Sequence, residues 1–210
     1  MSSQFDRRIP ELVRNLTHLY SLATPDEITS GVQWYPNAHA IVYEWAKTFD
    51  KSVVNIACII AALSPQCVWE RNLIIADDII RGDSPSISGA LRVNVEKATR
   101  IRDDEAEDIT RYFPCGPKVA SFALNLAGAY QHPTIDTHAM QAALNDVRAN
   151  YTLKPQPYAA FARAYELAAW QLKYPPALFQ AIIWHVWKRL NPTDYKRRRR
   201  GAYWIAIKTD

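Results

Sequence analysis

The sequence predicts an all-α fold, because its apolar residues recur at helical spacing in several long segments. Between residues 5 and 22 the apolar side chains fall on one side of a helix. Residues 52–63 (SVVNIACIIAAL) are almost wholly apolar, which is typical of a central buried helix. Residues 158–172 repeat the helical periodicity. With 210 residues, 49% of them hydrophobic, the chain is long enough for one large domain or two closely packed lobes.

Other segments carry the signals of helix ends. Thr24 to Glu27 resembles a helix start, with Pro25 just inside the helix and acids in its first turn, and Gly31 is expected to end that helix. Ser52 is expected to cap the buried helix, and Asn191 with Pro192 to stop the last one. The remaining expected helices span residues 37–49, 69–80, 94–101, 103–112, 119–127, 140–144 and 177–190.

Composition limits the class of protein. The net charge of +4 is compatible with a nucleic-acid surface without being diagnostic of one. Three cysteines without close spacing argue against a disulfide framework or a zinc site. The polar N-terminus lacks a signal peptide, and no apolar run reaches the roughly 18 residues of a membrane span. We therefore expect a cytoplasmic protein without metal or cofactor.

The most specific pattern lies between Tyr112 and Ala143. A turn containing Pro114 and Gly116 is followed by Lys118 and a small-residue apolar helix, and then by Ile135-Asp136-Thr137-His138, with Asp136 or Thr137 at a helix cap. Lys118 and Asp136 are 136 − 118 = 18 positions apart. A hairpin, a lysine and an IDTH sequence at this interval resemble the helix-hairpin-helix DNA glycosylases (the HhH-GPD, endonuclease III-like superfamily).

The resemblance implies a two-lobed helical fold. Lobe A would span about residues 50–133 and carry the hairpin at 109–127, and lobe B would combine 1–49 with 134–210. Bent double-stranded DNA would bind between the lobes, to a monomer, with one nucleotide flipped out. The resemblance covers about residues 50–145. Some relatives hold an iron–sulfur cluster on four C-terminal cysteines, which is excluded here because no cysteine follows Cys115.

Two residues carry the implied chemistry. Cleaving an N-glycosidic bond builds positive charge on the sugar, and a nearby carboxylate stabilises that charge. The resemblance gives this role to Asp136. An amine can instead attack C1′ and form a Schiff base that permits strand cleavage, for which Lys118 is the candidate. Each residue also has a simpler interpretation: Asp136 as a helix cap alone, and Lys118 as a phosphate contact.

A second group of residues is expected to hold the flipped nucleotide. In residues 33–39 (QWYPNAH), the aromatic rings would stack on the base and the amides would read its edge, although Trp34 and Tyr35 are equally compatible with core packing. Leu63, Ser64 and Gln66 match an LSxQ motif whose glutamine fills the gap in the duplex. The candidate pocket and DNA-contacting residues in this part of the chain are Gln33, Trp34, Tyr35, Asn37, His39, Gln66 and Trp69.

The hairpin and the C-terminus supply the other candidates. Cys115 and Gly116 would contact DNA phosphate, although Pro114 leaves this hairpin one amide donor fewer than the usual two-glycine form. His138 would support the Asp136 turn. The basic run from 196 to 200, which includes Arg198 and Arg199, would either neutralise DNA phosphates or form a solvated tail. His185 is interpreted as a packed or surface histidine.

The function predicted from these residues is excision of a damaged or modified base, with an additional lyase activity through Lys118. Repair is the ordinary role of the family. The unusual segment 33–39 favours a hypermodified pyrimidine, such as glucosylated hydroxymethylcytosine, in a phage or antiphage setting. Two alternatives stay open: an enzyme that alters a substituted pyrimidine without excision, and a noncatalytic DNA-binding protein.

Overall fold

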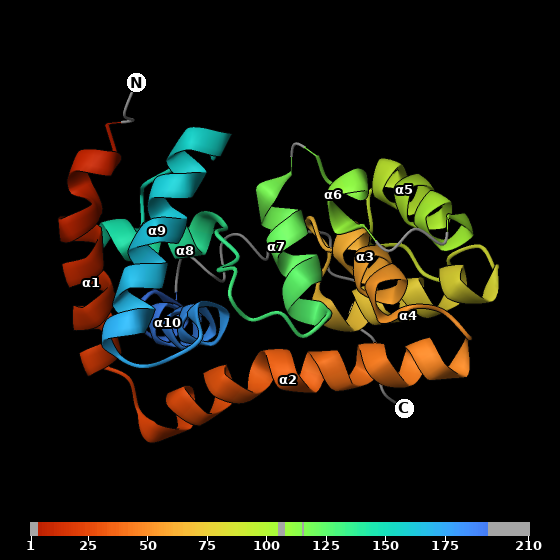
Figure 1. Cartoon of the computed structure of the whole chain (residues 1–210), viewed down its shortest axis with the longest axis horizontal. Helices are drawn as coiled ribbons and strands as arrows, with labels where there is room; N and C mark the ends of the chain where they lie inside the picture. The colour runs from red at the N-terminus through yellow and green to blue at the C-terminus, as the bar shows by residue number, and fades with distance from the viewer. Residues whose placement is uncertain (1–3, 105–107, 115, 193–210) are drawn as a thin grey trace.

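The computed structural model describes residues 4–104, 108–114 and 116–192, and all regular structure in these ranges is helical (Figure 1). The elements are η1 Asp6–Arg8, α1 Ile9–Ser21, α2 Pro25–Thr48, α3 Val53–Leu63, α4 Trp69–Arg81, α5 Arg92–Asp103, α6 Ile109–Tyr112, α7 Pro117–Leu126, α8 Thr137–Leu144, α9 Pro155–Gln171 and α10 Pro176–Leu190. The predicted all-α class is confirmed. No described helix combines the length and the apolar character needed to cross a membrane.

The long helix α2 is the main departure from the predicted elements. Thr24 and Glu27 start it as expected, with a capping box in which the Glu27 amide donates to Thr24 Oγ1 at 3.2 Å and the Thr24 amide donates to Glu27 Oε2 at 2.9 Å. The helix then continues through Gly31 and Pro36 to Thr48. The predicted helix end at Gly31 and the predicted loop at residues 33–39 are therefore wrong.

Packing explains why neither helix breaker ends α2. A Cβ on Gly31 would lie 2.6 Å from the N, Cα and Cγ1 atoms of Ile182, so glycine is what allows α2 and α10 to cross this closely. Pro36 has no amide hydrogen to donate to the carbonyl of Val32. Burial of the neighbouring Tyr35 against α10 and the loop before α8 offsets that loss.

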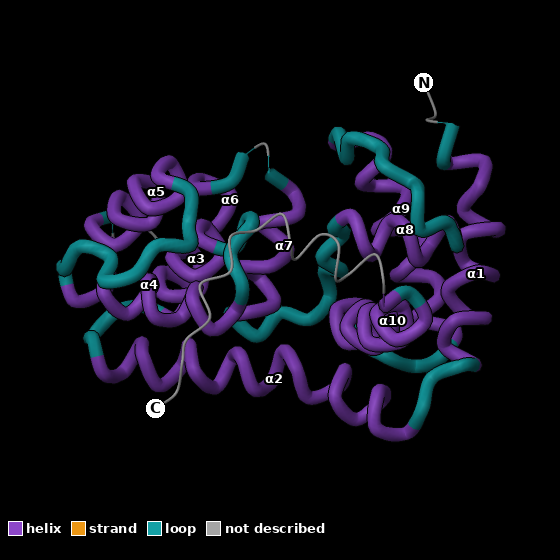
Figure 2. Tube along the Cα trace, turned by 180° about the vertical axis from the view of Figure 1, so that it is seen from behind, coloured by secondary structure: helices purple, strands orange, loops and turns teal. Residues whose placement is uncertain are grey.

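Two apolar clusters lie at opposite ends of α2, which runs beneath both of them (Figures 1 and 2). The first is built from α1, α8, α9 and α10. The second is built from α3 to α7 together with Ala38, Val42 and Ala46 of α2. A small third cluster joins Tyr35 to the start of α10. The buried residues of α2 from Ala38 onward thus pack with the second cluster.

The helix before the hairpin turn is shorter than predicted, whereas α6, the turn and α7 occupy the residues expected for the hairpin, 109–127. A single helix over residues 103–112 is wrong, because α5 ends at Asp103 and α6 is a separate four-residue helix capped by Asp108. Buried Asn55 helps to satisfy the end of α5: its Nδ2 donates to the carbonyl of Ile101 at 2.6 Å, and that carbonyl also accepts from the amide of Asp104 at 3.3 Å. The turn between α6 and α7 leaves Gly116 as the N-cap residue of α7.

Candidate active site

Asp136 occupies the N-cap of α8, as predicted. Its Oδ1 accepts a hydrogen bond from the amide of Ala139 at 2.7 Å, and its backbone is extended. The side chain is half-buried. Oδ2 accepts no hydrogen bond from any described residue. The cap therefore fixes the carboxylate while leaving one oxygen free for another partner.

The chain just before Asp136 is held by a buried tyrosine of α9. The hydroxyl of Tyr158 donates to the carbonyl of Pro133 at 3.1 Å, lies 3.1 Å from Ser121 Oγ, and accepts from the amide of Ile135 at 3.3 Å. Ile135 is fully buried, so its amide depends on this oxygen. Tyr158 thus connects α7, α9 and the backbone that positions Asp136.

A second set of bonds fixes the same loop from α2 and α7. Asn125 Nδ2 donates to the carbonyl of His132 at 2.7 Å and to Thr134 Oγ1 at 3.2 Å. The buried hydroxyl of Tyr35 donates to Thr134 Oγ1 at 3.0 Å and lies 3.5 Å from Gln180 Oε1. Tyr35 therefore supports the loop that carries the carboxylate, and contributes an apolar ring rather than a free polar group.

The surroundings keep three phenols protonated around the carboxylate. Burial raises the pKa of Tyr35, Tyr158 and Tyr165, and the negative charge of Asp136 adds to the increase in each pKa. The hydroxyl of Tyr165 donates to the carbonyl of Ala139 at 3.0 Å, which ties the first turn of α8 to α9. These neutral donors hold the backbone in place without neutralising Asp136.

An inner pocket of about 220 Å³ brings Asp136 and Lys118 together. Lys118 comes from the first turn of α7 and is exposed. It forms no hydrogen bond or ion pair with the described residues. The pocket is smaller than the roughly 300–1,000 Å³ that hold drug-sized ligands, so it has room for a single heterocycle.

Aromatic rings form the walls of the inner pocket. The ring centroid of Trp34 lies 5.3 Å from that of Trp69 and 6.1 Å from that of Phe122. Tyr35 meets Trp34 edge to face at 4.7 Å. These rings come from α2, α4 and α7, so the wall assembles only when the helices pack. Flat apolar surfaces of this kind can stack on a base.

Two residues that line the inner pocket carry a buried polar atom without a described partner. Asn72, on α4, is buried, and its Nδ2 donates to the carbonyl of Ile60 at 3.0 Å. Its Oδ1 is buried and accepts no hydrogen bond within the described chain. His185, on α10, likewise has a buried Nε2 without a described partner. Burial, followed by the charge of Lys188, lowers the pKa of His185, which favours the neutral ring.

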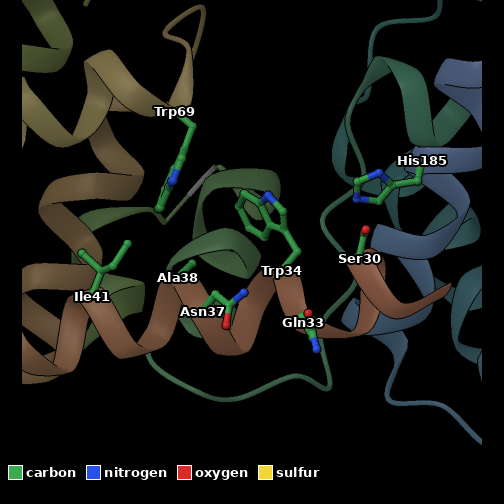
Figure 3. Close-up of a pocket in the computed structure, with 8 residues that line it drawn as sticks. All are labelled: Ser30, Gln33, Trp34, Asn37, Ala38, Ile41, Trp69 and His185. Atoms are coloured by element: carbon green, nitrogen blue, oxygen red, sulfur yellow. The ribbon is translucent and has the colours of Figure 1, made fainter. Parts of the chain in front are cut away.

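An outer pocket of about 310 Å³ adjoins the inner one. The two share Trp34, Trp69 and His185 in their linings. Gln33 and Asn37 line the outer pocket only (Figure 3). Of the predicted pocket residues, the structure therefore brings Trp34, Tyr35 and Trp69 to Asp136, and places the two amides next to them.

Other predicted site residues lie apart from both pockets. His39 Nδ1 lies 2.9 Å from the carbonyl of Leu126 at the end of α7, and this residue lines neither pocket. Gln66 is exposed on a left-handed turn with a φ of 63°. Gly116 and His138 line neither pocket.

Some predictions concern residues outside the described ranges. Cys115 and the basic run 196–200, with Arg198 and Arg199, are in this group. Sequence reasoning also missed several lining residues that the structure reveals: Phe122, Thr134, Gln180, Trp184 and His185. The one signal for the last pair was a tryptophan next to a histidine on an apolar helix, which is equally typical of core packing.

Comparisons with known proteins give one match. A family model described as a family of unknown function (DUF7178) matches residues 2–191. No curated protein and no solved structure matches the chain.

Proposed function

We propose a function for this chain, which belongs to the DUF7178 family: it is a DNA N-glycosylase that flips a damaged or modified base into the inner pocket and releases it. The observation that carries the proposal is the free Oδ2 of Asp136 in an aromatic-walled pocket that also receives Lys118. A carboxylate at the mouth of a stacking pocket is what an oxocarbenium-like transition state requires.

The proposed arrangement follows the two-lobed helix-hairpin-helix glycosylase fold. The two clusters on α2 would be its lobes, with the inner pocket between them. Double-stranded DNA would cross this junction in the cytoplasm, bound by a monomer. The extruded base would stack against Trp34 and Trp69, and Asn72 Oδ1 would accept a hydrogen bond from its edge.

The chemistry assigns one role to each charged residue. As the bond between C1′ and the base breaks, its electron pair leaves with the base, and Asp136 stabilises the positive charge on the sugar. Water then bonds to C1′ and gives its proton to the carboxylate. In the bifunctional version the amine of Lys118 attacks C1′ instead, and the resulting Schiff base allows elimination of the 3′ phosphate.

The first experiment avoids guessing the base. The protein is incubated with duplex DNA that contains one abasic site, and borohydride is added to reduce any Schiff base. We expect a covalent adduct that disappears in Lys118→Ala and persists in Lys154→Ala, a change of an exposed lysine outside both pockets. Absence of an adduct would remove Lys118 as nucleophile and leave hydrolysis by water.

The second experiment tests excision itself. Oxidised, alkylated and phage-modified DNA are each incubated with the protein, and released bases are identified by mass spectrometry. Asp136→Asn keeps a capping oxygen but loses the charge, so it should fold normally and lose on the order of a hundredfold in rate or more. Asp83→Asn, in an exposed loop, is the matched control.

The possible negative results of this second experiment distinguish the alternatives. If Asp136→Asn releases bases as fast as the natural protein, Asp136 is only a helix cap. If no DNA releases a base but DNA binding persists, the noncatalytic alternative or modification without excision replaces the proposal.

A further inference from the structure

The outer pocket is a built cavity next to the proposed base site. Ser30, Gln33 and Asn37 project into it from one stretch of α2, because positions three and four apart share a helix face. Figure 3 shows these residues along α2, with Trp34 between Trp69 and His185 in that view. The cavity thus combines aromatic surface with polar groups.

The polar groups of the outer pocket are available to a ligand. Gln33 and Asn37 are exposed, and neither amide makes a hydrogen bond with the described part of the protein. Ser30 Oγ is equally without a described partner. Each amide offers two donors and one acceptor oxygen. His185 lines both pockets as well, but its Nε2 is buried, so the accessible polar groups of the outer pocket are those of Ser30, Gln33 and Asn37.

Charge is absent from the lining of the outer pocket. None of its lining residues is Asp, Glu, Lys or Arg. The charged groups that act on His185 are Glu27 and Lys188. Glu27 is paired with Arg189 at 2.8 Å, and Lys188 Nζ lies over the ring of Trp184, 3.8 Å from its centroid. The pocket therefore suits a neutral ligand, since a phosphate would need a cation and an amine would need a carboxylate.

The position of the outer pocket beside the inner one indicates what that ligand is attached to. Trp34, Trp69 and His185 line both cavities, so the two cavities adjoin at these side chains, and a group bonded to the edge of a base in the inner pocket would reach the outer one by passing the ring of Trp34. The outer pocket has a volume of about 310 Å³, which gives room for a substituent on the base.

We infer that the outer pocket receives a neutral, hydroxylated substituent of the sugar type, carried by the base that occupies the inner pocket. This inference rests on the proposed function. The ring of Trp34 gives the substituent an apolar face, and Gln33 and Asn37 bond its hydroxyls.

Binding tests the inference independently of excision. Three duplexes of one sequence carry a single cytosine, 5-hydroxymethylcytosine or glucosylated 5-hydroxymethylcytosine, and affinities are measured by fluorescence anisotropy with the Asp136→Asn protein. Two or three new hydrogen bonds predict binding of the glucosylated duplex that is tighter than that of the other two by roughly tenfold or more. In the same protein, Gln33→Ala with Asn37→Ala should remove this preference, so that the three duplexes bind equally well.

Gln156→Ala is the matched control for the loss of the two amides. Gln156→Ala removes an exposed amide from α9, outside both pockets, and should keep the preference. Equal affinities for the three duplexes, or a preference that survives loss of both amides, would overturn the inference. Tighter binding of the glucosylated duplex without any base release would support the inference about the outer pocket and reject the glycosylase. Excision of small damaged bases without tighter binding of the glucosylated duplex would support the glycosylase and reject the inference about the outer pocket.

Discussion

The crossing of α2 and α10 at Gly31 makes a sharp prediction about stability. Gly31→Ala adds one methyl group at a point where it would lie 2.6 Å from the N, Cα and Cγ1 atoms of Ile182. Two of these three atoms belong to the main chain of α10, so a rotamer change cannot relieve the contact. The two helices would have to move apart.

The expected change in the free energy of unfolding of Gly31→Ala is the difference between two opposing effects. Alanine normally stabilises a helix interior by about 0.5–1 kcal/mol relative to glycine. Overpacking of a close-packed site costs about 1–3 kcal/mol, and the upper half of that range applies where backbone has to shift. We therefore expect a net loss of about 1–2 kcal/mol in the free energy of unfolding. For a chain of this size that loss lowers Tm by about 2–8 °C.

The assay is thermal unfolding followed by circular dichroism, with Gly116→Ala as the control. A Cβ at Gly116 meets nothing within 4 Å, so that variant has no overpacking cost and should lose less stability than Gly31→Ala, with the change at the N-cap of α7 as its cost. Adding Ile182→Ala to Gly31→Ala should give no rescue, because the main-chain atoms of residue 182 remain. A Gly31→Ala protein as stable as the natural one would refute the reasoning, as would full rescue in the double variant.

Three further changes test single contacts. Tyr158→Phe leaves the buried amide of Ile135 without an acceptor and should cost about 1–3 kcal/mol in urea denaturation, so a loss under about 0.5 kcal/mol would contradict it. Burial lowers the pKa of His185 in the folded state, so the unfolded chain binds its proton first and stability falls as pH drops below the ordinary value of 6.5. In His185→Gln, the decline in Tm from about pH 7.5 to about pH 5.5 should be smaller than in the natural protein, and an equal decline would count against this assignment. Thr24→Ala removes the capping box with Glu27 and should cost about 1 kcal/mol, measured by the same thermal assay.

The helices that could be predicted from the sequence are those whose ends are fixed by hydrogen bonds between residues close together in the chain. Ser52 accepts a hydrogen bond from the amide of Asn55 at 3.0 Å, and the apolar run after it becomes the buried helix α3, as its pattern indicates. Asp136 at the cap of α8 follows the same logic. A capping side chain acts within three residues of its own position, so the sequence contains both partners.

The unpredicted features depend on contacts across the fold. Gly31 and Pro36 carry the two strongest local signals for a break, and nothing near them in sequence indicates that Ile182 of α10 packs against the glycine. The sequence around His185 does not indicate a pocket residue. His185 lines the outer pocket together with Trp34 and Trp69, which lie more than a hundred residues away in the chain. Such long-range packing overrides local propensity.

The continuity of α2 also determines what the two pockets can do together. In the predicted loop, Gln33 and Asn37 would have been free to turn with Trp34 toward any bound base. On a helix their separations are fixed, so the amides open onto the outer pocket while Trp34 stands between it and the pocket of Asp136. In the proposed function, selection of a substituent and stacking of the base would thereby depend on one rigid element. The same element is held against α10, the helix of His185, by the Gly31 crossing. A change at Gly31 should therefore weaken the preference of the outer pocket together with stability, even though Gly31 lines neither cavity.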